Sequence, residues 1–161
     1  MSAIGAPPIH PDVEPLTGLV GTWTGGGRGD YPTIASFLYA EEVRISHVGK
    51  PFLAYAQRTW SPADGSPLHS ESGFWRPQGA GSIEILLAHP FGVVEISEGR
   101  ISWPEITVTS KALISSTTGS EVEGIRRTFH LRGDRLTYTV DMAASGHPLQ
   151  QHLEAELTRA G

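Results

Sequence analysis

Turn residues recur along this chain mostly every 8 to 16 residues, and this spacing limits the possible folds more than any other feature. Glycine and proline mark the turns instead of gathering in a linker. Between the turns apolar and polar residues alternate, as in 135–143, where Leu136, Tyr138 and Val140 share one face. A period of two is typical of half-buried strands. About ten strands are expected from the following segments: 18–27, 38–48, 51–61, 67–77, 82–89, 92–98, 100–109, 110–116, 121–132, 135–143 and 149–159.

Many short strands with tight turns predict an all-β fold, either a sandwich or an antiparallel barrel. Closure is the simplest way to hide strand edges, so we expect an up-and-down antiparallel β-barrel of about ten strands. The last segment, 149–159, has a helix-favouring composition, but we expect a strand because the barrel needs it to close against the first strand. Short helical turns are expected only near the N-terminus, at Pro11–Leu19, where Asp12 can cap the turn, and at Pro32–Phe37.

The length of 161 residues favours a single domain over 1–161, with residues 1–10 flexible. Seventeen acidic against 12 basic side chains give a net charge of -5, which argues against nucleic acid as a partner. No apolar run reaches the roughly 18 residues that a bilayer span requires, and the N-terminus lacks the pattern of a signal peptide. We therefore expect a cytoplasmic protein that does not act at a membrane.

The chain has no cysteine, which excludes disulfides, thiolate ligands and covalent c-type haem. Any metal must be held by histidine, carboxylate or methionine. Walker-type loops, HExxH, GxSxG and EF-hand patterns are also absent. The residues alone therefore indicate a small barrel that can enclose one apolar ligand, and a lipid carrier and a haem carrier are equally compatible with this pattern.

Several of the seven histidines lie on the predicted strands or at their ends. His69 and Glu71 share a strand face and could ligate a metal or exchange a proton, although an exposed or hydrogen-bonded pair is the simpler interpretation. His130 is expected in solvent, and His89 at a rim of the barrel. Arg127 interrupts the otherwise apolar face of its strand.

Several ordered motifs resemble the nitrobindin family of β-barrel haem proteins. Gly21, Trp23, Gly25 and Gly27 match a GxWxGxG element, and Tyr31–Thr33 match a following YPT element. The match continues to the C-terminus through these segments: Glu41–Val43, His47–Phe52, Pro67–Glu71, Ala88–Pro90, Gly92, Glu95, Met142–Ala143 and Pro148–Leu153. The ordered set covers nearly the whole chain, from about Leu16 to Arg159.

The resemblance implies a ten-stranded barrel that holds one non-covalent haem b per chain. His152, in the C-terminal motif, corresponds to the axial ligand of the iron, and Thr33 to a haem-contacting position. Family members bind nitric oxide and, in the ferric state, isomerise peroxynitrite to nitrate, so an enzyme with these small-molecule ligands is expected. The alternative is a non-enzymatic carrier or sensor, which holds nitric oxide on the haem or an apolar ligand in the barrel.

Two features of this sequence depart from that expectation. Simple alternation along 150–159 places Leu153 on the inner face and His152 outside. Either a bulge or an off-axis haem at the barrel mouth brings His152 to the ligand, or the apolar stripe faces an outer layer such as the N-terminal turn. Many relatives carry Thr-Ala-Lys where this chain has Thr118–Ser120, so a basic contribution from that lysine is missing. The strand positions further suggest a pocket wall of Tyr39, Leu53 and Met142, the last as a core thioether in preference to a second iron ligand.

Overall fold

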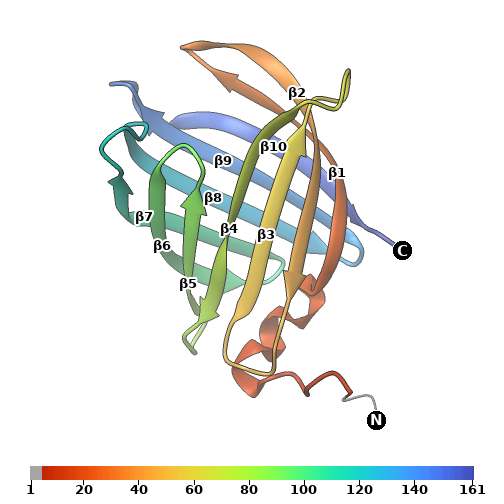
Figure 1. Ribbon diagram of the computed structural model, residues 1–161. Helices are drawn as coiled ribbons and strands as arrows, with labels where there is room; N and C mark the ends of the chain where they lie inside the picture. Colours follow the sequence, from red (N-terminus) through yellow and green to blue (C-terminus); the bar gives the residue numbers. More distant parts are fainter. Residues whose placement is uncertain (1–4) are drawn as a thin grey trace.

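Ten antiparallel strands form a closed barrel in the computed structural model, which describes residues 5–161 (Figure 1). Each strand pairs with its neighbours in sequence, and β10 pairs with β1 to close the ring. The strands are β1 (Gly21–Tyr31), β2 (Ile34–Ser46), β3 (Leu53–Trp60), β4 (Pro67–Pro77), β5 (Ser82–His89), β6 (Val93–Ser102), β7 (Glu105–Ser115), β8 (Val122–Arg132), β9 (Arg135–Ala144) and β10 (Gln150–Arg159). The up-and-down barrel and its closing final strand are confirmed. The flexibility expected for residues 1–10 falls partly on residues 1–4, which lie outside the described residues.

One short 3₁₀ helix, η1 (Pro11–Leu19), confirms the first of the two predicted helical turns. Its cap is His10 and not Asp12, because Nδ1 of His10 accepts the Asp12 N–H at 3.2 Å. The second helical prediction, at Pro32–Phe37, is wrong. Tyr31 pairs with Ile34 across a tight hairpin, so no room remains for a helical turn, and Pro32 suits the turn itself. Within residues 5–161 no helix combines the length and the apolar character needed to cross a membrane.

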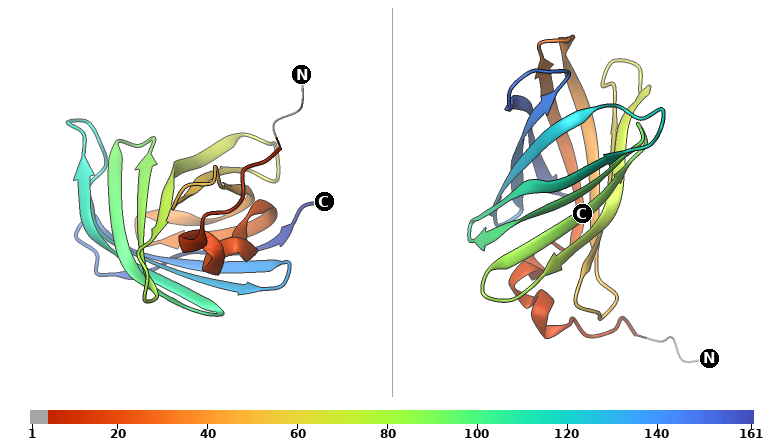
Figure 2. Two further views of the ribbon diagram at one scale, coloured as in Figure 1. Left: turned by 90° about the horizontal axis from the view of Figure 1, so that it is seen from below. Right: turned by 90° about the vertical axis from the view of Figure 1, so that its left-hand side faces the viewer.

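The lower end of the barrel in Figure 1 is covered by η1, as the view from below in Figure 2 shows. Leu16 and Leu19 of η1 are fully buried in the core, and burial of each such side chain is worth about 1.5–3 kcal/mol. Trp23 at the start of β1 donates its indole N–H to the Leu19 carbonyl at 2.9 Å. Arg159 at the end of β10 stacks on Trp23, with its guanidinium carbon 4.4 Å from the ring centre, and donates to the carbonyl of Gly18 at 2.6 Å. The first and the last strand of the barrel, β1 and β10, therefore both hold η1 in place.

The glycines of β1 allow neighbouring strands to approach closely. A Cβ on Gly25 would collide with the main-chain oxygen of Glu156, and a Cβ on Gly27 would collide with the ring of Tyr39. Glycine removes this obstacle because it has no side chain. In this structure the GxWxGxG element therefore packs β1 against β10 and β2.

A β-bulge interrupts the alternation of β10. Gln151 faces Asp141 of β9, whereas Leu153 faces the next residue of β9, Val140, so His152 is the additional residue of the bulge. A bulge shifts the strand by one position and re-aims the side chain that it carries. His152 and Leu153 consequently both line the interior of the barrel.

Candidate ligand-binding site

A cavity of about 810 Å³ occupies the end of the barrel away from η1, which is a volume typical of small-molecule sites. Thr33, Tyr39, Met142 and His152 all line it, so the structure brings together four residues singled out from the sequence. Leu53 is not among the lining residues, because it is fully buried in the core next to Trp75 of β4. The motif residues Gly21, Trp23, Gly25 and Gly27 do not line the cavity either.

His152 is oriented by the main chain at the end of β1. Its Nδ1 lies 3.0 Å from the carbonyl oxygen of Asp30. Since a carbonyl only accepts hydrogen bonds, Nδ1 carries the proton and Nε2 keeps its lone pair. The ring of Tyr31 meets the imidazole edge-on, with 5.4 Å between the ring centres. Histidines that bind metals characteristically donate their other ring nitrogen in this way, so His152 has the arrangement of a metal ligand.

Much of the cavity wall is apolar. The lining includes Ile34, Leu68, Phe91, Ile125, Val140 and Leu153. This part of the wall suits a large planar or aliphatic ligand.

The segment Thr118–Ser120, which replaces the Thr-Ala-Lys of many relatives, lies in the connection between β7 and β8. Ser120 lines the cavity, and its N–H donates to the carbonyl of Phe91 at 3.0 Å. A Cβ on Gly119 would collide with the main chain of Gly92, so this loop packs too closely for a larger residue there. The segment thus closes against the β5–β6 turn and presents no basic side chain to the cavity.

A buried ion pair lies on the cavity wall. The guanidinium of Arg127 binds both oxygens of Glu71, at 2.9 and 3.1 Å, and both oxygens of Glu95, at 3.0 and 2.8 Å. Burial by itself would raise the pKa of Glu95, but Arg127 and the hydrogen bonds from His89, Arg127 and Ser97 lower it to about 2. The same opposition leaves the pKa of Glu71 well below its usual value, mainly through the charge of Arg127. Both carboxylates are therefore ionised.

A second buried carboxyl, Glu41, belongs to a separate hydrogen-bonded group. The Tyr138 hydroxyl donates to it at 2.8 Å, and the Gln57 amide lies 2.5 Å from its Oε2. The hydroxyl groups of Tyr39 and Tyr138 form a hydrogen bond with 2.8 Å between their oxygens. Burial raises the pKa of Glu41 to about 7, because these hydrogen bonds offset only part of the desolvation. Unlike Glu71, this carboxyl has no cation in direct contact among the described residues.

These buried polar residues were not identified as a group from the sequence. Arg127 was seen only as a break in an apolar face, yet the structure keeps it on that inner face, 5% exposed. A charged residue in an inward stripe requires buried partners of opposite charge, and this signal could have pointed to Glu71 and Glu95. The outward position expected for His130 is confirmed, because its side chain is 41% exposed and pairs with Glu105 at 2.8 Å.

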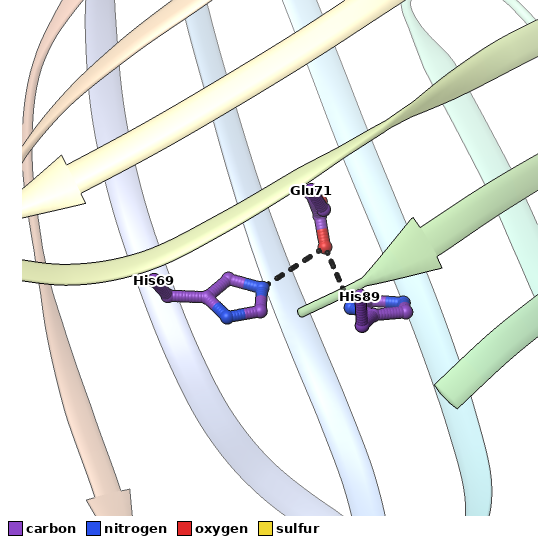
Figure 3. A group of neighbouring side chains, drawn as sticks. All are labelled: His69, Glu71 and His89. Carbon is purple, nitrogen blue, oxygen red and sulfur yellow. Dashed lines mark hydrogen bonds and ion pairs between the residues drawn. The ribbon is translucent and has the colours of Figure 1, made fainter. Parts of the chain in front are cut away.

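The predicted pair of His69 and Glu71 is present, with 3.5 Å between His69 Nε2 and Glu71 Oε2. Glu71 is buried and His69 is partly exposed, so the pair is not the exposed one considered from the sequence. His89 joins it from β5, as Figure 3 shows.

A barrel closed at one end, with a ligand-sized cavity and an oriented imidazole at the other, defines a β-barrel that binds a small ligand in its interior. Comparison with known proteins then identifies the family. Residues 12–159 match the model of the THAP4-like, heme-binding beta-barrel domain, and the chain belongs to this family. The resemblance to the nitrobindin family is thereby confirmed.

Relatives of similar length carry the name peroxynitrite isomerase. Peroxynitrite isomerase 2 of Mycobacterium avium is 48% identical over 155 residues, which cover 94% of this chain and 96% of the relative. A peroxynitrite isomerase of Arabidopsis thaliana is 46% identical and covers 96% of this chain and 92% of its own length. The crystal structure of Rv2717c from M. tuberculosis superimposes with a TM-score of 0.90 at 42% identity, over 96% of this chain and all of that one.

Proposed function

We propose that this chain holds one non-covalent haem b in its cavity and isomerises peroxynitrite to nitrate. The observation that carries the proposal is the orientation of His152, whose Nδ1–H is held by the Asp30 carbonyl while Nε2 has no hydrogen-bond partner among residues 5–161. Support also comes from relatives named peroxynitrite isomerase that are 43–48% identical over nearly the full chain. No cysteine competes for the iron, so imidazole is the expected ligand.

Two residues of this chain would have direct roles in holding the haem. Nε2 of His152 would bind the iron, and Thr33, which lines the same cavity, would contact the haem. When bound, a ferric haem supplies a Lewis-acidic iron with one open coordination position. Apolar lining residues such as Val140 and Leu153 would pack against the haem. Peroxynitrite and nitrate have the same atoms and charge, so the reaction needs no proton donor or external electron from the protein.

Reconstitution with haemin tests the site. We expect wild-type protein to bind one equivalent with a sharp Soret band, and His152→Ala to bind at least about 100-fold more weakly, since loss of an outer-shell partner alone costs 10–100-fold. His147→Ala is the matched control, because His147 also packs edge-on against Tyr31, with 5.9 Å between ring centres, but does not line the cavity. Equal haemin binding by wild type and His152→Ala would refute the assignment of the ligand.

Stopped-flow measurement of peroxynitrite decay, combined with the yield of nitrate, tests the activity. The ferric holoprotein should accelerate decay beyond free haemin and give nitrate as the main product. We also propose that nitric oxide binds at the same iron, which a shift of the Soret band under nitric oxide would reveal. A haem-loaded protein that binds nitric oxide but decays peroxynitrite no faster than free haemin would favour a sensor or carrier over an enzyme.

A further inference from the structure

Three potential metal ligands meet on neighbouring strands at the cavity wall, as Figure 3 shows. His69 and Glu71 lie on the same face of β4, two residues apart, and His89 ends the adjacent strand β5. Oε2 of Glu71 lies 3.5 Å from Nε2 of His69 and 3.4 Å from Nδ1 of His89. All three ligand atoms fall within 4.8 Å of one another. One carboxylate oxygen therefore faces two imidazole nitrogens.

The tautomer of His89 directs a lone pair into this group. Its Nε2 lies 2.9 Å from the carboxylate of Glu95, which accepts that ring N–H. In the neutral ring Nδ1 is then an acceptor, and it has no hydrogen-bond partner among residues 5–161 although its side chain is only 3% exposed. A buried acceptor without a partner costs free energy, and a cation at this point would satisfy it. Histidines that bind a metal through one ring nitrogen commonly donate the N–H of the other ring nitrogen to a carboxylate, as His89 does to Glu95.

The distances match coordination better than hydrogen bonding. With zinc–ligand bonds of 2.0–2.2 Å in a tetrahedral site, neighbouring ligand atoms lie about 3.3 Å apart. The two observed separations, 3.4 and 3.5 Å, are close to this value. They are long for a hydrogen bond to a carboxylate, which normally measures 2.7–2.9 Å. Two of the three separations thus match those between ligands of one metal ion, and the third is within 4.8 Å.

The surroundings leave Glu71 able to act as a ligand. Oε1 of Glu71 accepts from Tyr55 and from Arg127, each at 2.9 Å, whereas Oε2 accepts from Arg127 at 3.1 Å and its only further hydrogen-bond contact is a long one of 3.5 Å with His69 Nε2. A carboxylate oxygen has two lone pairs, so one on Oε2 remains for a metal. Glu71 and Glu95 together carry two negative charges against the single positive charge of Arg127, and this excess favours a cation.

We propose that His69, Glu71 and His89 bind a divalent transition-metal ion, with zinc(II) as the best match, at a site separate from that of His152. Two histidines, one carboxylate and an open fourth position form a ligand set that zinc uses in catalytic sites. The site faces the same cavity, because all three residues line it. β5 is five strands from β10 in either direction around the barrel, so the metal lies across the cavity from His152. A fourth ligand, such as a water molecule or a small anion, would bind from the cavity side.

Titration of the haem-free protein with Zn²⁺ tests the site without reference to haem. Isothermal titration calorimetry should give one equivalent for wild type, with affinity at least about 100-fold lower in His69→Ala. His69 is partly exposed, so this variant should fold, and circular dichroism checks that it does. His130→Ala is the matched control, since it removes a histidine paired with a glutamate on the outer surface and should bind Zn²⁺ as wild type does.

Co²⁺ provides a second, spectroscopic readout. Wild type should develop visible d–d absorption typical of four- or five-coordinate Co²⁺, Zn²⁺ should displace it, and His89→Gln should lack it. Unchanged Zn²⁺ affinity in His69→Ala, or no binding by wild type at micromolar concentrations, would overturn the proposal. The three residues would then belong only to the ion-pair network, with a protonated His89 between Glu71 and Glu95. Haemin binding is measured separately, so either proposal can fail without the other.

Discussion

Replacing Glu41 with glutamine should remove a pH-dependent loss of stability. Glu41 is 1% exposed and is held by neutral partners, Gln57 and Tyr138. Burial raises its pKa from 4.5 to about 7. Between these two values the folded protein binds more protons at this site than the unfolded chain does. The free energy of unfolding therefore falls as pH rises through this window.

The pKa difference sets the size of the effect. A rise from 4.5 to about 7 corresponds to about 3 kcal/mol, which is fully lost only above the folded pKa. Glutamine has nearly the same shape but stays neutral at every pH. Glu41→Gln should thus have nearly wild-type stability at about pH 4.5 and exceed wild type by up to about 3 kcal/mol at about pH 8.

Urea unfolding followed by tryptophan fluorescence at several pH values measures this difference, since the chain has four tryptophans. The difference in the free energy of unfolding between the two proteins cancels the contribution of every other titrating group that they share. Glu156→Gln, on the outer face of β10, is the control and should follow wild type across the range. A Glu41→Gln variant that is destabilised by the same amount at both ends of the range would refute the argument.

Three further substitutions test the ion pair, the glycine strand and the closed end. Arg127→Met leaves two buried carboxylates without a cation and should lower the free energy of unfolding by about 3–5 kcal/mol in urea, so a loss below about 1 kcal/mol would contradict the buried pairing. Gly27→Ala forces a methyl group against Tyr39 and should cost about 1–3 kcal/mol, whereas Gly124→Ala, whose methyl would meet Ala143 at 3.7 Å, should be nearly neutral in the same titration. Leu16→Ala opens a cavity beneath η1 and should cost about 2–5 kcal/mol, seen as a lower midpoint in thermal unfolding, and an unchanged midpoint would show that η1 does not stabilise the barrel.

The fold was largely predictable because the barrel depends on short-range signals. Turn residues and alternation identify strands locally, and closure then assigns a strand to 149–159 in spite of its helix-favouring composition. The error at Pro32–Phe37 arose because a proline that follows Asp30 and Tyr31 suits the first turn of a helix and the corner of a hairpin equally well. Pairing between Tyr31 and Ile34, a property of the register, decides between them.

The site was less predictable because its contacts are long-range. Tyr39 and Met142 line the cavity as their strand positions suggested, but Leu53, with the same inward parity, lies at the level of the core. Alternation gives the face of a strand and not the height along the barrel. Likewise, nothing local shows that Arg127 reaches Glu71, 56 residues earlier in the chain.

The bulge in β10 means that the inward position of His152 depends on chain length as well as on residue type. Deleting Gln151 would let the strand resume simple alternation with no change to the histidine itself. Insertion or deletion of a single residue is therefore enough to create or abolish such a site in a ten-stranded barrel. Among homologous barrels, the number of residues between the last hairpin and the histidine is consequently a better guide to the site than the identity of its neighbours.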